Sequence, residues 1–190
     1  MKLSSILRLS GADRIARRYF VVNSFDGILT SLGIIVGVFA GGVAEPAVII
    51  VAVAGASIAL AVSGTSSAYI TEEAEDKSSM RTVERAMLKD LSKTSIGMAT
   101  SKSPLLVGLI NGLSPALASF LILIPSILAA MGALPVRYLF VTSIIVAFTL
   151  LIFLGVYLGR VAKEKAWLYA LKTVGIGAIA LICTSVIRLF

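Results

Sequence analysis

Residues 104–130, PLLVGLINGLSPALASFLILIPSILAA, contain no charged side chain. A bilayer has a hydrocarbon core of about 30 Å, which a helix of roughly 20 residues can cross, so this stretch alone predicts a transmembrane helix. Four further apolar stretches have a similar length. We therefore expect an all-α integral membrane protein whose transmembrane domain, residues 19–190, has five helices at about 19–42, 47–70, 104–130, 136–159 and 167–189.

The composition suits a protein that is dissolved in lipid. Hydrophobic residues make up 58% of the 190 residues and charged residues only 14%, with a mean hydropathy of +1.00. This leaves too little polar surface for a water-soluble domain. The absence of histidine excludes histidine-based triads and imidazole metal sites, so we expect neither an enzyme nor a permanently bound cofactor. Cys183 is the single cysteine, which excludes an intrachain disulfide.

The basic residues indicate an orientation. Fourteen of them lie before the first span, between the second and third, and between the fourth and fifth, whereas the opposite side carries only Arg137 and Arg188. The positive-inside rule then places the amino terminus in the cytoplasm and the carboxyl terminus outside. This placement explains the net charge of +7 without nucleic acid, which we do not expect as a partner. Residues 1–18 predict a basic amphipathic segment on the inner membrane surface, with a frayed basic tail as the alternative.

Asp26 is the first candidate for a functional residue. A carboxylate within an apolar helix is costly unless it faces a cavity, a partner or a bound cation. The alternative is a structural carboxylate that pairs with Arg17 or Arg18 near the inner membrane surface. Asp26 shares a polar-to-small helix face, at steps of three and four residues, with Asn23, Thr30, Gly33 and Gly37.

The third span adds a polar residue to these candidates. Asn111 precedes Pro115 by four residues, and a proline inside a membrane helix frees a backbone carbonyl and permits a kink. Such kinks border transport paths, although they also occur as packing features. We predict that Asn23, Thr30 and Asn111 line a pathway that includes Asp26.

Residues 71–93 predict a charged cytoplasmic helix that continues the second span, because they contain good helix formers and no glycine or proline. Carboxylates on neighbouring helix faces can hold a divalent cation, and a thioether adds preference for softer transition metals. The alternative is a solvated helix with intrahelical ion pairs, such as Glu73 with Lys77. In addition to Asp26, the predicted metal-binding residues are Glu72, Glu73, Glu75, Asp76, Met80 and Glu84.

Residues 23–33, NSFDGILTSLG, resemble the first-span motif of the vacuolar iron transporter family. The five spans, the charged cytoplasmic helix and the proline-bearing third span also look like that family. The resemblance implies a homodimeric carrier that exports ferrous iron, and sometimes manganese, in exchange for protons, with Asp26 as the family's first-span aspartate. The family's second span carries a methionine and, four residues later, a glutamate, where this sequence has Gly64 and Ala68.

Two hypotheses of different classes follow. The first is a secondary transporter in the cell membrane of a prokaryote that exports Fe²⁺ or Mn²⁺. An ion gradient would drive it, because no P-loop motif for ATP binding occurs. The second is a non-transporting membrane protein that binds a partner, or scaffolds a dimer, through its charged cytoplasmic helix. Gly64 and Ala68 favour the second hypothesis.

Overall fold

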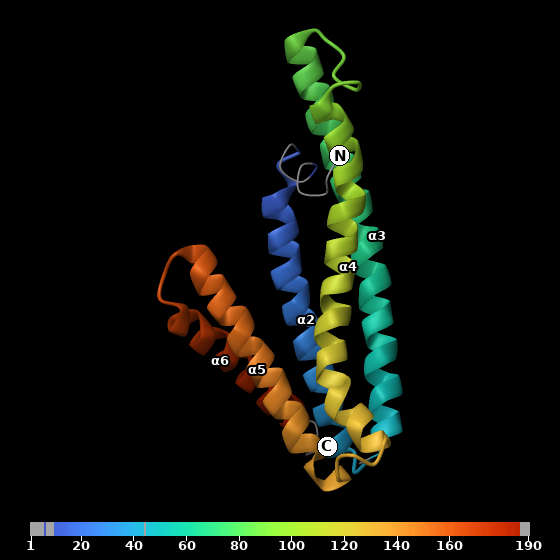
Figure 1. The fold of residues 1–190 in the computed structure, drawn as a ribbon, viewed down its shortest axis with the longest axis vertical. Coiled ribbons are helices and arrows are strands. Elements are labelled where there is room, and N and C mark those ends of the chain that lie inside the picture. Colours follow the sequence, from blue (N-terminus) through green and yellow to red (C-terminus); the bar gives the residue numbers. More distant parts are fainter. Residues whose placement is uncertain (1–5, 7–9, 44, 187–190) are drawn as a thin grey trace. The chain divides into compact units, whose positions relative to one another are not determined.

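The computed structural model describes residues 6, 10–43 and 45–186 (Figure 1). Each of the five long helices in this part of the chain is long and apolar enough to cross a membrane. The described residues contain no strand, so the expected all-α fold with five transmembrane helices is confirmed. The helices are α2 (Ala12–Ala40), α3 (Pro46–Met87), α4 (Ser95–Ala130), α5 (Val136–Ala162) and α6 (Ala166–Val186).

α2 begins earlier than the expected first span. It starts at Ala12 rather than near residue 19, so the end of the predicted amphipathic segment is continuous with the span. Within that segment, residues 1–5 and 7–9 lie outside the described part of the chain. The arginines close to the span therefore extend from the same helix that carries Asp26.

α3 is one uninterrupted helix of 42 residues, which corresponds to about 63 Å at 1.5 Å per residue. Pro46 occupies its first position, where a missing N–H group costs no helical hydrogen bond. No glycine or proline follows between Thr65 and Met87, and the helix continues through this whole stretch. The predicted helical continuation of the second span is therefore present, but it ends at Met87 rather than at 93.

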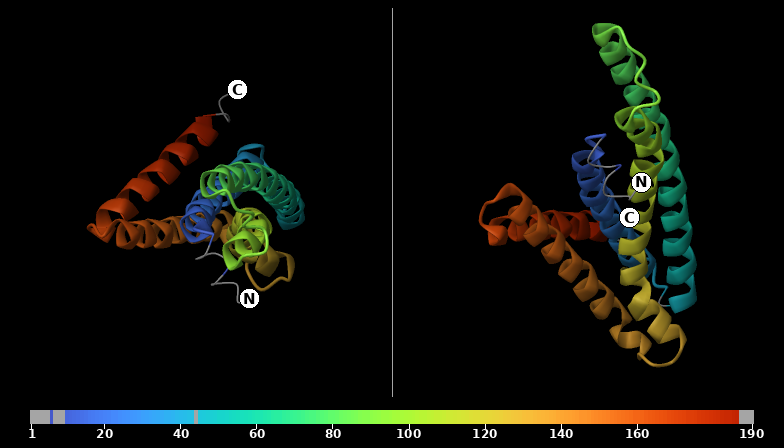
Figure 2. Two further views of the ribbon diagram at one scale, coloured as in Figure 1. Left: turned by 90° about the horizontal axis from the view of Figure 1, so that it is seen from above. Right: turned by 45° about the horizontal axis from the view of Figure 1, so that its top comes forward.

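The continuation of α3 is one arm of a helical hairpin. α4 starts at Ser95, well before the expected span at 104. Thr94 caps this helix, because its Oγ1 accepts the N–H of Gly97 at 3.1 Å. Residues 88–94 join the two arms, and Figure 2 shows the end of α3 and the start of α4 side by side. The sequence prediction contained only the first arm of this hairpin.

The chain divides into two compact units. Unit 1 comprises residues 1–23 and 61–114, and unit 2 comprises residues 24–60 and 115–190. In unit 1, the glycines of α4 bring its backbone close to α3. A Cβ atom on Gly112 would lie 1.9 Å from Thr65 Oγ1 and 2.4 Å from the Ala61 carbonyl oxygen. Only glycine fits this approach, which positions the polar residues described below.

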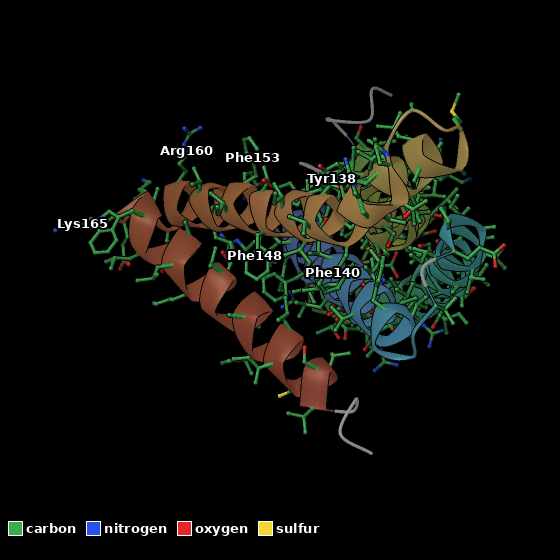
Figure 3. The ribbon with its side chains drawn as sticks, turned by 90° about the horizontal axis from the view of Figure 1, so that it is seen from below. Tyr138, Phe140, Phe148, Phe153, Arg160 and Lys165 are labelled. Carbon is green, nitrogen blue, oxygen red and sulfur yellow. The ribbon has the colours of Figure 1, made fainter. Side chains whose placement is uncertain are left out.

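Unit 2 contains the hairpin of α5 and α6, whose ribbons are shown in Figure 3. A Cβ on Gly155 would lie 2.5 Å from the Cα of Ala170, and a Cβ on Gly159 would lie 2.5 Å from the Cα of Ala166. The Thr173 hydroxyl donates to the Leu151 carbonyl at 2.8 Å. Small residues thus allow the two helix backbones to pack directly on each other, as is common in membrane proteins.

Candidate functional site

Asp26 is exposed on α2 in unit 2. Its neighbours Ser24 and Ile28 are buried, at 7% and 2% exposure, so the carboxylate points away from the packed side of the helix. Arg17, one of the two arginines considered as partners, pairs with Asp13 at 3.5 Å. Asp26 has no ion pair with any residue in the described part of the chain. It is therefore a carboxylate without an ion pair among the described residues, in the part of α2 after Arg18 that carries no other charge.

Two of the predicted pathway residues are hydrogen-bonded to each other in unit 1. The side-chain amide of Asn23 donates to the Asn111 side-chain oxygen, and it also donates to the Tyr19 carbonyl at 2.9 Å. The Asn111 amide donates to the Gly64 carbonyl at 2.6 Å. We call Asn23, Asn111 and Gly64 the amide clasp, because they join α2, α4 and α3. The third predicted pathway residue, Thr30, is half-buried in unit 2.

The glycine at position 64 leaves room for the amide clasp. A Cβ there would lie 3.3 Å from the Asn111 amide nitrogen and 3.4 Å from the Cα of Gly112. A longer side chain would push the Asn111 amide away from the carbonyl that it binds. Ala68, one turn later, is only 3% exposed. The amide of Asn111 therefore occupies the space beside position 64, where the family that this sequence resembles carries its methionine.

Two carboxylates of the α3 arm are withdrawn from water. Glu72 is 5% exposed, and it interacts with the Tyr19 side chain of α2. Asp76 accepts a hydrogen bond from the Ser103 hydroxyl at 2.7 Å. Burial raises the pKa of Asp76 above its ordinary value, the Glu75 carboxylate raises it further, and the bond from Ser103 acts in the opposite direction. The protonated form of Asp76 is thus favoured compared with a free aspartate.

The other acidic residues of the hairpin remain closer to water. Glu73 pairs with Lys77 at 2.7 Å, with side-chain exposures of 37% and 65%, as the solvated-helix alternative predicted. Glu75 is exposed. Glu84 has a structural partner, because its Oε1 accepts the N–H of Leu91 at 2.9 Å and so ties the connecting loop to α3.

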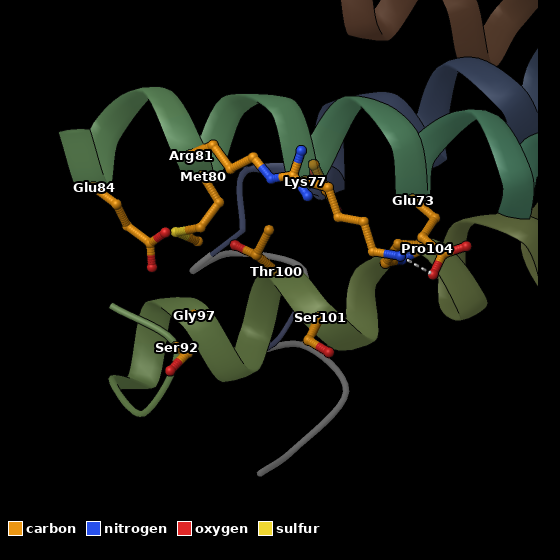
Figure 4. A pocket seen from close by; sticks show the side chains of 11 residues that line it. Glu73, Lys77, Met80, Arg81, Glu84, Ser92, Gly97, Thr100, Ser101 and Pro104 are labelled. Atoms are coloured by element: carbon orange, nitrogen blue, oxygen red, sulfur yellow. Dashed lines mark hydrogen bonds and ion pairs between the residues drawn. The ribbon is translucent and has the colours of Figure 1, made fainter. Parts of the chain in front are cut away.

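A cavity of about 340 Å³ between α3 and α4 brings four of the predicted metal-binding residues together (Figure 4). Two basic side chains, Lys77 and Arg81, also line it. No three acidic, cysteine or histidine side chains in the described part of the chain are grouped so that they could hold a metal ion. The metal-binding role of the seven residues therefore stays a prediction. The four that line the cavity are Glu73, Asp76, Met80 and Glu84.

The contribution of α4 to this cavity was missed in the sequence. Thr100 and Ser101 line it from the first turns of α4, and Ser92 lines it from the loop. The available signal was Thr94, a residue type that commonly caps helices and that stands before a stretch without proline up to 103. Hydropathy alone placed the start of the third span at 104, since Ser101, Lys102 and Ser103 interrupt the apolar pattern.

Comparisons with known proteins agree with this architecture. A family model described as the VIT family matches residues 72–188, more than half of the chain. An uncharacterized protein of Methanocaldococcus jannaschii is 30% identical over 177 residues, which cover 91% of this chain and 89% of the relative. The family match begins at the acidic residues of the α3 arm and does not include Asp26, so it is independent of the first-span motif. The chain therefore belongs to the VIT family, as the resemblance of residues 23–33 implied.

Proposed function

We propose that this protein is a secondary transporter that exports Fe²⁺ or Mn²⁺ from the cytoplasm in exchange for protons. Membership of the VIT family implies transport of metal ions across a membrane. The choice of metal, the direction and the proton exchange are the proposal. The observation that carries it is Asp26, an exposed and unpaired carboxylate on a helix that can cross the membrane.

A charge at this position requires a partner that the single chain does not provide. An aspartate at the centre of a membrane helix costs about 2.5–3.5 kcal/mol on insertion scales, and more when it cannot reach water. A divalent cation or a proton would each neutralise Asp26. Because both bind the same oxygens, binding of one would release the other, which is the elementary step of metal and proton exchange.

A homodimer would cover Asp26 in the membrane. Gly37, on the same helix face, has open space where a Cβ would stand, and a Cβ on Gly33 would find its nearest neighbour at 3.9 Å. Small residues spaced by four permit a second helix to approach closely. In a two-fold dimer formed through this face, the two copies of Asp26 would lie near each other and share a cation.

Dimerisation through α2 can be tested with a single introduced cysteine. Cys183 is the only native cysteine, so Gly37→Cys in a Cys183→Ser background presents one thiol. We expect oxidation in the membrane to give a disulfide-linked dimer. The matched control is Val141→Cys, at an exposed position of α5. Equal cross-linking of the two variants, or no cross-linking of the Gly37→Cys variant, would contradict an α2 interface.

The remaining predicted residues fit a route that starts at the hairpin. Its carboxylates would raise the local concentration of cations at the cytoplasmic mouth. Within unit 1, the amide clasp would border the path beyond it, and Thr30 stays a predicted lining residue on α2. The positive-inside distribution supports a cytoplasmic amino terminus, and we place the protein in the cell membrane of a prokaryote.

The deciding experiment is metal flux into proteoliposomes under an imposed proton gradient, with Fe²⁺, Mn²⁺, Co²⁺ and Zn²⁺ compared. We expect gradient-dependent flux for the wild type and none for Asp26→Asn, because the amide carries no charge that a metal and a proton could exchange. Asp13→Asn is the control, since Asp13 lies on the same helix but forms only an exposed pair with Arg17.

One set of contacts favours the second hypothesis, a membrane protein that binds a partner without transport. Glu73, Asp76 and Glu84 all have protein hydrogen-bond partners, and this leaves fewer oxygens for a metal. A folded wild-type protein that transports none of the four metals would favour the partner-binding hypothesis. Flux that persists in Asp26→Asn would keep transport but remove Asp26 from its centre.

A further inference from the structure

α6 carries a lysine where an apolar helix face is expected. Lys172 lies five residues beyond Trp167, inside the expected fifth span, or about 7.5 Å along the helix axis. Tyr169 and Lys172 are three residues apart and lie on one face of α6, and Lys165, four residues before Tyr169, stands directly before the helix. The neighbouring face packs on α5 through Ala166, Ala170 and Thr173. The lysine face is therefore not the face that α5 covers.

Both lysines are exposed, and neither forms an ion pair with a described residue. The Nζ of Lys172 lies 4.8 Å from the centre of the Tyr169 ring. Tyr169 precedes Lys172 by almost one turn, so the lysine side chain extends back toward the start of α6. This is the direction in which a lysine in a membrane helix reaches the polar interface.

The turn that joins α5 and α6 adds positive charge at the same end. Arg160 and Lys163 lie at the end of α5, and Glu164 is the one acidic residue of the turn. Figure 3 shows Arg160 and Lys165 projecting from the end of the hairpin where the two helices meet. The potential at this end is therefore positive, and it attracts anions to the membrane surface.

We propose that the face formed by Lys165, Tyr169 and Lys172 binds the phosphate headgroup of an anionic phospholipid, in the leaflet that contains the α5–α6 turn. A lipid fits better than free phosphate because Lys172 emerges among exposed apolar side chains, including Leu168 and Leu171. These surfaces require acyl chains beside the charged headgroup. The proposal concerns the outer face of α6 and does not depend on transport or on Asp26.

The single tryptophan of the chain makes the test direct. Trp167 is exposed, and it lies between Lys165 and Tyr169 in the sequence. The full-length protein is reconstituted in phosphatidylcholine vesicles that contain equal mole fractions of either brominated phosphatidylglycerol or brominated phosphatidylcholine, and the quenching of Trp167 fluorescence is compared. We expect the anionic lipid to quench several-fold more strongly. Equal quenching by the two lipids would overturn the proposal.

Substitutions then assign the preference to this face. Each lysine near an anionic surface contributes a factor of roughly five, so Lys165→Gln and Lys172→Gln should each lower the preference, and the double variant should lower it to what Arg160 and Lys163 attract. Lys172→Arg should retain it, because the charge remains. Arg137→Gln, at the opposite end of α5, is the matched control and should leave it unchanged. A preference that is undiminished in the double variant would overturn the proposal.

Inorganic phosphate distinguishes a lipid site from a site for the free anion. Added at millimolar concentration with ionic strength held constant, it should not displace brominated phosphatidylglycerol, since it offers no acyl chains. Loss of the lipid preference at that concentration would identify a free-phosphate site and overturn the assignment to lipid.

Discussion

Both units bring helices together at glycines, but among the described residues only unit 1 joins helices by hydrogen bonds between two side chains. In unit 1, side-chain hydrogen bonds connect different helices, through the amide clasp and through the pair of Asp76 and Ser103. In unit 2, the α5–α6 hairpin is closed mainly by glycines that face the backbone of the opposite helix. Three buried serine hydroxyls of unit 2 have no hydrogen-bond partner among the described residues, at Ser31, Ser126 and Ser143.

The difference shows that buried polar side chains stabilise contacts between helices in unit 1 more than they do in unit 2. Buried polar groups that are hydrogen-bonded fix specific contacts, whereas buried small residues mainly allow close packing. Asp26 belongs to the unit that relies on packing, and it has no ion-pair partner in the described part of the chain. This contrast singles it out more clearly than its residue type does.

The largest expected loss of stability comes from a substitution that disrupts the packing of α5 on α6 in unit 2. Gly159→Leu would place a Cβ 2.5 Å from the Cα of Ala166, and overpacking of this kind costs about 3 kcal/mol. Gly175→Leu is the control, because no atom lies within 4 Å of its Cβ position. Thermal unfolding in detergent measures both. If the two variants had equal midpoints, close backbone packing would not stabilise unit 2.

A smaller effect is expected in the amide clasp. Asn111→Leu keeps the side-chain volume but leaves the Gly64 carbonyl and the Asn23 amide without their partner, which costs about 2 kcal/mol. Asn111→Asp is the comparison, because its oxygens can still accept from Asn23 but cannot donate to Gly64. The same unfolding assay applies. A Leu variant as stable as the wild type would show that polar bonding is not what stabilises unit 1.

The smallest effect concerns the pH dependence of unit 1. Because the pKa of Asp76 is raised in the folded protein, its contribution to stability is fully present below the pKa of an unfolded aspartate and is lost as the pH rises through the folded pKa. Asp76→Asn removes this loss. The melting temperature of the variant relative to the wild type should therefore be higher at pH 7 than at pH 4. Glu164→Gln, at an exposed carboxylate of the α5–α6 turn, is the control, and a relative melting temperature independent of pH would contradict the assignment.

The sequence predicted the helices well because each one is determined by local hydropathy. The five spans and the continuation of α3 follow from apolar length and from the absence of breakers after Gly64. The second arm of the hairpin did not follow, because Ser95 to Ser103 is too polar for a span. A local cap at Thr94 was the only signal for it.

The contacts of the site were less accessible to sequence reasoning. Helical spacing placed Asn23 and Asp26 on one face, but it could not show that Asn23 meets a residue 88 positions away. Spacing also grouped the acidic residues of α3 without showing which become buried. Glu72 is buried, whereas Glu75 is exposed, because the faces that contact α2 and α4 are chosen by tertiary packing.

The unbroken helix between Thr65 and Met87 also has a mechanical consequence. This segment is about 33 Å long. Its first residue, Thr65, directly follows Gly64, the glycine of the amide clasp. A tilt of about 10° at that end would displace the far end by roughly 6 Å at this length. Leu88 directly follows this segment and is 93% exposed. A spin label at Leu88 would therefore report a small rotation of the transmembrane part of α3 as a large displacement in water.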